Sequence, residues 1–197
     1  MEKQQWSENV IIADADYVDK VAFNLIVNFE RMLGRRIPQA DMPRWVDCIA
    51  LDGGLRQGDN TTQVLLVHDK GNETMENFKP SRLTDELDGK AFKDNIGEFL
   101  FSALTVEDMV DKEHLFCDSL MHICSQKEVK RVMVVPNAEK YLDGVKRALK
   151  NVDDDKRVTV FAMQPIQGGN FRQEILGYSL MNALGIRGEE ISNKEQY

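Results

Sequence analysis

The 197-residue chain lacks most of the features that place a protein in a membrane, a secretory pathway or a zinc-finger class. No apolar run approaches the roughly 20 residues that a membrane-spanning helix needs. The polar segment MEKQQWSEN has no basic stretch followed by an apolar one, as a secretory signal would. The three cysteines, Cys48, Cys117 and Cys124, show no short metal-type spacing. We therefore expect a cytoplasmic protein with reduced cysteines and no membrane partner.

Positive charge is also scarce. There are 25 lysines and arginines against 33 aspartates and glutamates, for a net charge of −8. An acidic surface repels phosphates, which argues against a nucleic-acid partner unless a basic patch is segregated locally. A small molecule, another protein or a second copy of the chain remain as partners. The apolar fraction of 42% is typical of a globular domain with a buried core.

Hydrophobic periodicity predicts alternating strands and helices. The predicted strands are residues 10–13, 45–51, 63–68, 98–104, 131–135 and 158–163. The predicted helices are residues 18–33, 109–124, 139–150 and 171–184. Thr105 and Asp108 resemble a capping box for the second of these helices.

This alternation predicts one three-layer α/β/α domain over residues 1–186, followed by a polar, frayed tail over 187–197. Its sheet would be mostly parallel and Rossmann-like, with about six strands. The loop between the second and third strands, DGGLRQGDNTT, has no helical pattern, so we expect these two strands to form an antiparallel hairpin. The hairpin would carry His68 and Asp69 to the opposite edge of the sheet.

In open α/β sheets, ligands bind at the carboxyl ends of the strands. The residues expected there are Asp14, Asp16, Asp52, Asn137, Glu139, Gly168, Gly169 and Asn170. Asp14 and Asp16 allow two interpretations. With Asn137 and Glu139 they could bind Mg²⁺ or Mn²⁺, which prefer oxygen ligands. Alternatively, Asp16 caps the following helix and Asp19 complements its dipole. Capping is the more economical interpretation, although it explains Asp14 least well.

The two glycine pairs are weaker signals. DGGLRQG lacks the Lys-Ser/Thr ending of a phosphate-binding loop, and QGGN lacks the spacing of a dinucleotide fingerprint. Turn geometry accounts for both, although the backbone N–H groups of a glycine pair can hold an anion. Ligand contacts from Asp52, Asn137 and residues 168–170 therefore remain open. The sequence contains no Ser-His-Asp or Cys-His spacing that indicates a nucleophile.

Four stretches resemble the NYN branch of the PIN-like nucleases: IIADAD, Asp118 in its predicted helix, VMVVPNAEKYLDGVKRAL and VTVFAM. The resemblance implies a PIN-like sheet in which Asp14, Asp118 and Glu139 hold Mg²⁺ or Mn²⁺ and a metal-bound water attacks an RNA phosphodiester. The chain departs from the family at Asn137 and Glu139, where the family has two aspartates, which implies altered or lost catalysis. The whole chain also resembles a bacterial family of unknown function, which implies no activity.

Two functional hypotheses follow from these observations. The first is an α/β domain that binds a ligand or a protein partner and has no complete catalytic motif. The alternative is a divalent-metal-dependent ribonuclease or phosphodiesterase of the PIN-like type, in degenerate form if its catalysis is lost. A third and weaker idea is a nucleotide-binding module that uses the QGGN loop.

Overall fold

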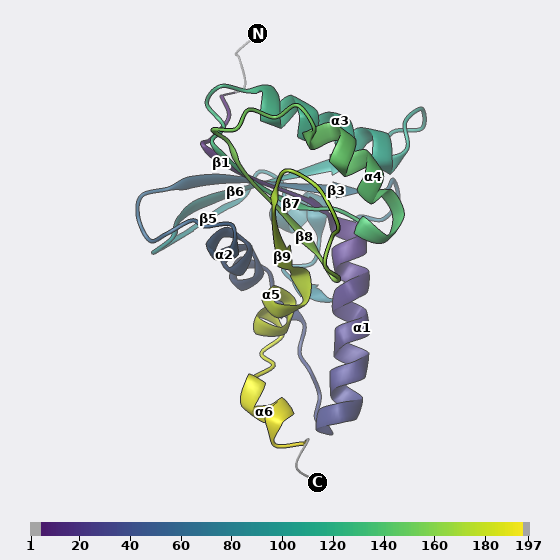
Figure 1. Cartoon of the computed structure of the whole chain (residues 1–197). Helices are drawn as coiled ribbons and strands as arrows, with labels where there is room; N and C mark the ends of the chain where they lie inside the picture. The colour runs from purple at the N-terminus through teal and green to yellow at the C-terminus, as the bar shows by residue number, and fades with distance from the viewer. Residues whose placement is uncertain (1–4, 195–197) are drawn as a thin grey trace.

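Strand β1 (Asn9–Asp14) lies at the centre of a seven-stranded sheet with the order β5-β6-β3-β1-β7-β8-β9. The computed structural model describes residues 5–194 of the chain (Figure 1). The other six strands are β3 (Thr61–His68), β5 (Ala91–Asp94), β6 (Gly97–Thr105), β7 (Arg131–Val135), β8 (Arg157–Ala162) and β9 (Arg172–Ile175). All neighbouring strands are parallel except β5 and β6. The mostly parallel α/β sheet predicted from the sequence is therefore confirmed.

Helices cover both faces of this sheet (Figure 1). One face packs against α3 (Lys112–Ser125) and α4 (Ala138–Leu149), and the other packs against α1 (Ala15–Leu33), α2 (Met42–Asp52) and α5 (Leu176–Ala183). Along β1 the side chains alternate between the two cores, with Val10 and Ile12 on the α3–α4 side and Ile11 and Ala13 on the other. The small elements are β2 (Ala40–Asp41), β4 (Phe78–Lys79), the π-helical turn Leu83–Leu87 and α6 (Gly188–Ser192).

The order of the parallel strands reveals where a site would lie. Counted along the chain, the six parallel strands lie in the order third, second, first, fourth, fifth, sixth. This is the doubly wound order of Rossmann-type sheets, in which the direction of winding reverses between the first and fourth strands. Here the reversal falls between β1 and β7, with α1 on one face and α4 on the other.

The predicted strand over residues 45–51 is wrong, because this segment lies within helix α2. Asp41 caps the helix by accepting a hydrogen bond from the backbone N–H of Arg44, and Pro43 occupies the first turn. Trp45, Val46, Ile49 and Ala50 are fully buried at helical spacing. A short apolar run fits a strand or a buried helix equally well.

The predicted hairpin is wrong for the same reason. α1 and α2 together form the crossover from β1 to β3, so β3 runs parallel to β1, with Asp14 beside Val67. His68 and Asp69 therefore lie at the same edge of the sheet as Asp14. The antiparallel pair is β5 with β6, at the edge of the sheet.

Three further boundaries differ from the predictions. α3 begins at Lys112 with Asp111 as its N-cap, and the expected cap residue Thr105 instead ends β6. The predicted helix 171–184 is divided into strand β9 and helix α5. The predicted frayed tail contains helix α6, and Glu190 of this helix forms an ion pair with Arg35 at 2.7 Å. Residues 195–197 of the tail lie outside the described part of the chain.

No helix within residues 5–194 is long and apolar enough to cross a membrane. The cytoplasmic location and the partners expected from the sequence remain predictions.

Candidate functional site at the switch point

Asp14 is the last residue of β1 and is completely buried. It is the N-cap of α1, where its Oδ1 accepts a hydrogen bond from the backbone N–H of Tyr17 at 3.1 Å. Its Oδ2 accepts a hydrogen bond from the hydroxyl of Tyr141, on α4, at 2.5 Å. The expectation that Asp16 caps this helix is therefore wrong, since Asp14 takes that position and Asp16 lies in the first turn.

Lys112 joins three carboxylates that come from two strand ends. Its ammonium lies 2.6 Å from Asp16 Oδ2, 2.9 Å from Asp69 Oδ2 and 3.2 Å from Asp14 Oδ1. The side chain is 17% exposed. Burial alone would lower the pKa of Lys112, but the hydrogen bonds to Asp16 and Asp69 and the charge of Asp14 outweigh it, and the pKa is raised. Lys112 therefore remains a cation at physiological pH.

Asp69 and Asp16 also hold the loop that follows β3. Asp16 Oδ2 accepts the backbone N–H of Asp69 at 2.8 Å, and its Oδ1 accepts the side-chain amide of Asn72. Burial raises the pKa of Asp16 in spite of these bonds and of Lys112. Burial would also raise the pKa of Asp69, but Lys112 lowers it below the usual value. The two carboxylates thus share one cation in unequal environments.

A cleft of about 320 Å³ opens beside this network, between α3 and the start of α4. Its lining residues are Asp69, Val106, Asp111, Lys112, Glu113, Asn137, Lys140 and Tyr141. Asn137 is the N-cap of α4, yet its side chain makes no capping bond, and its buried Oδ1 has no hydrogen-bond donor among the described residues. Buried polar atoms normally have a partner, so this amide oxygen is available for a ligand group.

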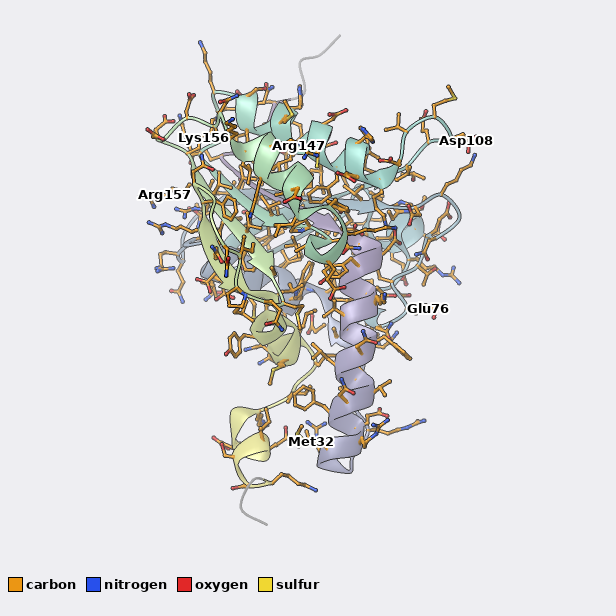
Figure 2. All side chains as sticks on the ribbon, turned by 45° about the vertical axis from the view of Figure 1, so that its right-hand side comes forward. Met32, Glu76, Asp108, Arg147, Lys156 and Arg157 are labelled. Atoms are coloured by element: carbon orange, nitrogen blue, oxygen red, sulfur yellow. The ribbon has the colours of Figure 1, made fainter. Side chains whose placement is uncertain are left out.

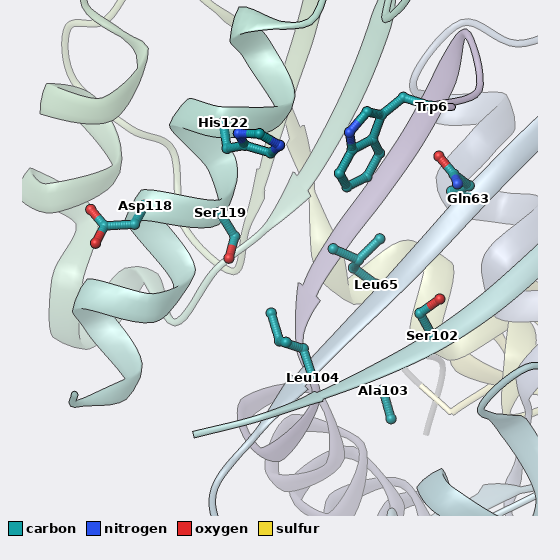
Figure 3. A pocket seen from close by; sticks show the side chains of 9 residues that line it. All are labelled: Trp6, Gln63, Leu65, Ser102, Ala103, Leu104, Asp118, Ser119 and His122. Atoms are coloured by element: carbon teal, nitrogen blue, oxygen red, sulfur yellow. The ribbon is translucent and has the colours of Figure 1, made fainter. Parts of the chain in front are cut away.

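Two of the other predicted site residues, Glu139 and Asp118, do not line this cleft. Glu139 is exposed in the first turn of α4. Its charge acts on Tyr17, whose pKa is raised to about 12 by the burial of its side chain and then by the charges of Glu139 and Asp14. Asp118 is midway along α3 and lines a different cavity (Figure 3).

That second cavity, of about 400 Å³, lies between α3 and the face of β3 and β6. Trp6 and His122 form part of its wall, with their rings at a centroid distance of 6.0 Å in an edge-on arrangement. Figure 3 shows the Asp118 carboxylate pointing away from the side chains of Leu65 and Leu104. The structure therefore does not bring Asp118 together with the lysine-bound carboxylates.

Asp52 and the QGGN loop also lie away from the cleft. Asp52 ends α2, next to Gly53. The carbonyl of Gly53 accepts a hydrogen bond from Arg131, the first residue of β7, so Asp52 lies at the amino edge of the sheet. Asn170 donates to the carbonyl of Leu149, at the far end of α4. Gly168 and Gly169 are in the same connection between β8 and β9 and have positive φ angles of 74° and 104°, as turn residues.

The divalent metal that the PIN-like resemblance implies does not fit these residues. The carboxylates of Asp14 and Asp16 do converge, but the ammonium of Lys112 lies between them. Within residues 5–194, no group of three or more His, Cys, Asp or Glu side chains is placed to hold a metal ion. The four residues predicted as metal ligands, Asp14, Asp16, Asp118 and Glu139, thus do not form one cluster, and metal binding remains an untested prediction.

Sequence reasoning missed Lys112, Tyr141 and Asp69. Lys112 is the first residue of α3, where a positive charge opposes the helix dipole, so a lysine at this position indicates an external carboxylate partner. Tyr141 lies four residues before the buried Val145, on the inner side of α4. The predicted hairpin puts Asp69 at the opposite edge of the sheet, whereas β3 is parallel to β1 and brings it to the edge of Asp14.

Comparison with known proteins supplies a family but no activity. No curated protein and no solved structure matches the chain, so the resemblance to PIN-like nucleases stays unconfirmed. The profile of one family of unknown function matches residues 3–191, which is nearly the whole sequence. The chain therefore belongs to the family of unknown function DUF6621.

Proposed function

We propose that this domain binds a small polar molecule in the switch-point cleft and does not transform it. The observation that supports this most directly is the amide oxygen of Asn137, which has no hydrogen-bond donor within residues 5–194 and lies at the carboxyl end of β7, where the winding of the sheet reverses. Ligands in open α/β sheets bind at this position. The cleft volume of about 320 Å³ is at the lower end of the range for small-molecule sites.

The chemistry of the cleft wall favours a ligand that carries both hydrogen-bond donors and acceptors. Asn137 Oδ1 requires an N–H or O–H donor from the ligand. Lys140, which is exposed on the cleft wall, offers an ammonium to a ligand oxygen, and Asp69 offers a carboxylate to a ligand N–H or O–H group. Amino acids, polyols and nucleosides belong to this class.

Binding without catalysis is favoured because the reactive groups are already engaged. The buried His68 has Nδ1 3.1 Å from the carbonyl oxygen of Asp69 and Nε2 3.1 Å from Thr105 Oγ1. Burial, followed by the charge of Glu113, raises the pKa of the Cys117 thiol to about 11, which keeps it protonated at neutral pH. Lys112 is fixed by its carboxylates, and its raised pKa makes it a poor proton acceptor.

A thermal-shift screen of amino acids, polyols and nucleosides tests the proposal. A ligand at one hundred times its Kd stabilises the folded state by about 2.7 kcal/mol, which is a shift in Tm of about 5–10 °C for a domain of this size. The shift should be lost in Asn137→Leu. It should persist in Asn170→Leu, which removes the same amide at the opposite edge of the sheet.

Two results would contradict the proposal. One is a screen in which no polar compound raises the Tm of the wild-type protein. The other is a ligand whose effect is equal in the wild type and in Asn137→Leu, since its site would then lie elsewhere. Turnover of the bound compound, followed by mass spectrometry, would show that the domain is an enzyme.

A further inference from the structure

Four arginines gather at the amino edge of the sheet, opposite the cleft. Arg131 and Arg157 are the first residues of β7 and β8 and pair directly in the parallel register. Arg172 begins β9 and pairs with Thr159, two residues beyond Arg157, so its side chain points to the same face. Arg56 is in the loop after α2, beside the glycine that Arg131 contacts.

Two of these arginines are held in place by backbone carbonyls at the end of α2. Arg131 Nη1 donates to Gly53 O at 2.7 Å, and Arg56 Nη1 donates to Leu55 O at 2.9 Å. Arg131 is half-buried, and its buried Nε has no hydrogen-bond acceptor among the described residues. The strand register and the contacts at the end of α2 bring the four arginines to one edge. Burial, and then the charges of Arg157, Arg172 and Arg56, lower the pKa of Arg131.

The other two arginines extend into solvent without a partner. Arg157 and Arg172 are exposed, and over residues 5–194 neither forms a side-chain hydrogen bond or an ion pair. In Figure 2, Arg157 and Asp108, which is in the loop before α3, lie on opposite sides of the molecule. Arg131 and Arg157 begin β7 and β8, whereas the cleft lies at the carboxyl ends of the strands, so the arginines and the cleft are at opposite edges of the sheet.

Carboxylates also lie at this edge: Asp153, Asp154 and Asp155 shortly precede Arg157 in the chain, Asp52 ends α2, and Glu174 is two residues after Arg172 on the same face of β9. Burial, followed by the charge of Glu174, raises the pKa of Asp52. Neither Asp52 nor Glu174 forms an ion pair with an arginine in the described structure.

We propose that the amino-edge arginines bind the phosphate groups of a ligand. A guanidinium presents a planar set of N–H donors that matches two phosphate oxygens, and Arg is enriched wherever phosphate is recognised. Neighbouring strands are about 4.8 Å apart, so Arg131 and Arg157 can contact the same phosphate or adjacent ones. Because this site is at the opposite edge of the sheet, the proposal does not depend on the cleft.

Titration calorimetry with inorganic pyrophosphate at low salt tests this inference on the full chain. Wild type should bind saturably, and the double variant Arg157→Gln/Arg172→Gln should bind at least about tenfold more weakly, because charge-assisted hydrogen bonds are lost. The matched control, Arg31→Gln/Arg36→Gln, removes the same charge from exposed positions at the end of α1 and should bind as wild type does.

A second variant guards against misfolding as the cause of lost binding. Asp52→Asn removes a negative charge from the patch, so pyrophosphate should bind more tightly than to wild type. Damage to the fold cannot produce tighter binding. Absence of saturable binding to wild type, or equal losses in the two double variants, would overturn the proposal.

A single-stranded oligonucleotide distinguishes the source of the phosphate. If a nucleic acid is the ligand, it should bind more tightly than pyrophosphate, with a slope of log K against log salt of up to about −3 for four arginines. If a small phosphorylated molecule is the ligand, pyrophosphate should bind and the oligonucleotide should show no tighter binding. Both outcomes require the loss in Arg157→Gln/Arg172→Gln.

Discussion

Replacing Lys112 with methionine tests whether the carboxylate network is as the structure describes it. Methionine keeps an unbranched side chain of similar length but removes the cation. Asp14 and Asp16 would then face each other and Asp69 without a counter-charge, and Asp14 is completely buried. The substitution should therefore destabilise the folded state strongly at neutral pH.

The magnitude follows from the burial of Lys112. Removing one partner of a buried ion pair costs about 3–5 kcal/mol, because the remaining charge is left without compensation. The side chain of Lys112 is 17% exposed, so water reaches part of the site. We therefore expect a loss of about 3 kcal/mol in the free energy of unfolding. With a urea m-value of about 2–3 kcal/mol/M for this size, the unfolding midpoint should fall by about 1 M.

Urea unfolding followed by circular dichroism measures this loss, and Lys70→Met is the matched control. Lys70 pairs with Asp108 at 2.9 Å, but both side chains are more than 60% exposed, so its loss should cost less than about 1 kcal/mol. The effect of Lys112→Met should shrink as the pH falls towards 4, because protonation removes the repulsion. If Lys112→Met and Lys70→Met had the same urea midpoint at pH 7, the idea that Lys112 stabilises the three carboxylates would be refuted.

Two other substitutions test the hydrogen bond from Tyr141 to Asp14 and the ionisation of Asp47 by the same urea assay. Tyr141→Phe removes the hydroxyl that donates to Asp14 and should lower the free energy of unfolding by about 2 kcal/mol. The control Tyr178→Phe, at a tyrosine that is 70% exposed, should change it by less than about 0.5 kcal/mol. Equal effects of the two substitutions would contradict the hydrogen bond. Burial, and then Asp94, raise the pKa of Asp47 to about 7, so the ionisation of this one group lowers the stability of the folded state as the pH rises from about 4 to 7. The full pKa shift corresponds to about 4 kcal/mol, which solvent screening of this partly exposed carboxylate reduces to about 1–2 kcal/mol. Asp47→Asn should therefore be more stable than wild type by about 1–2 kcal/mol at pH 8 and equally stable at pH 4. A pH-independent difference would show that the charge is not the cause.

Most of the β-strands could be predicted because two-sided burial leaves a strong pattern. The strands at 131–135 and 158–163 have nearly continuous apolar sequences, and the structure confirms both as β7 and β8. The long helix ending at Gly34 was equally clear, since its apolar residues recur every three or four positions and the glycine adopts a φ of 65°. These signals are local, and each is decided by a few adjacent residues.

Residues 45–51 could not be assigned as reliably, because WVDCIAL is too short for apolar content alone to separate a strand from a helix. The decisive signal lay before the segment, where Asp41 and Pro43 start a helix. This one local error had a distant consequence. With a strand at 45–51 and no helix between it and β3, these two segments are predicted to pair antiparallel, and this places Asp69 at the wrong edge.

The candidate site was predictable only as far as the topology was. Asp14 ends β1 and Asn137 follows β7, and the rule for parallel sheets brings both to the correct edge. Whether Asp14 and Asp16 meet a metal ion or a lysine depends on where α3 begins, and the apolar pattern of residues 109–124 does not fix that start. Lys112 lies ninety-eight residues beyond Asp14, so only the folded chain reveals that the cation is supplied by the protein itself. An acidic pair at a strand end therefore fits a helix cap, a metal ion or an ammonium group equally well, and the tertiary structure shows that Asp14 caps α1 while Lys112 supplies a positive charge beside both acids.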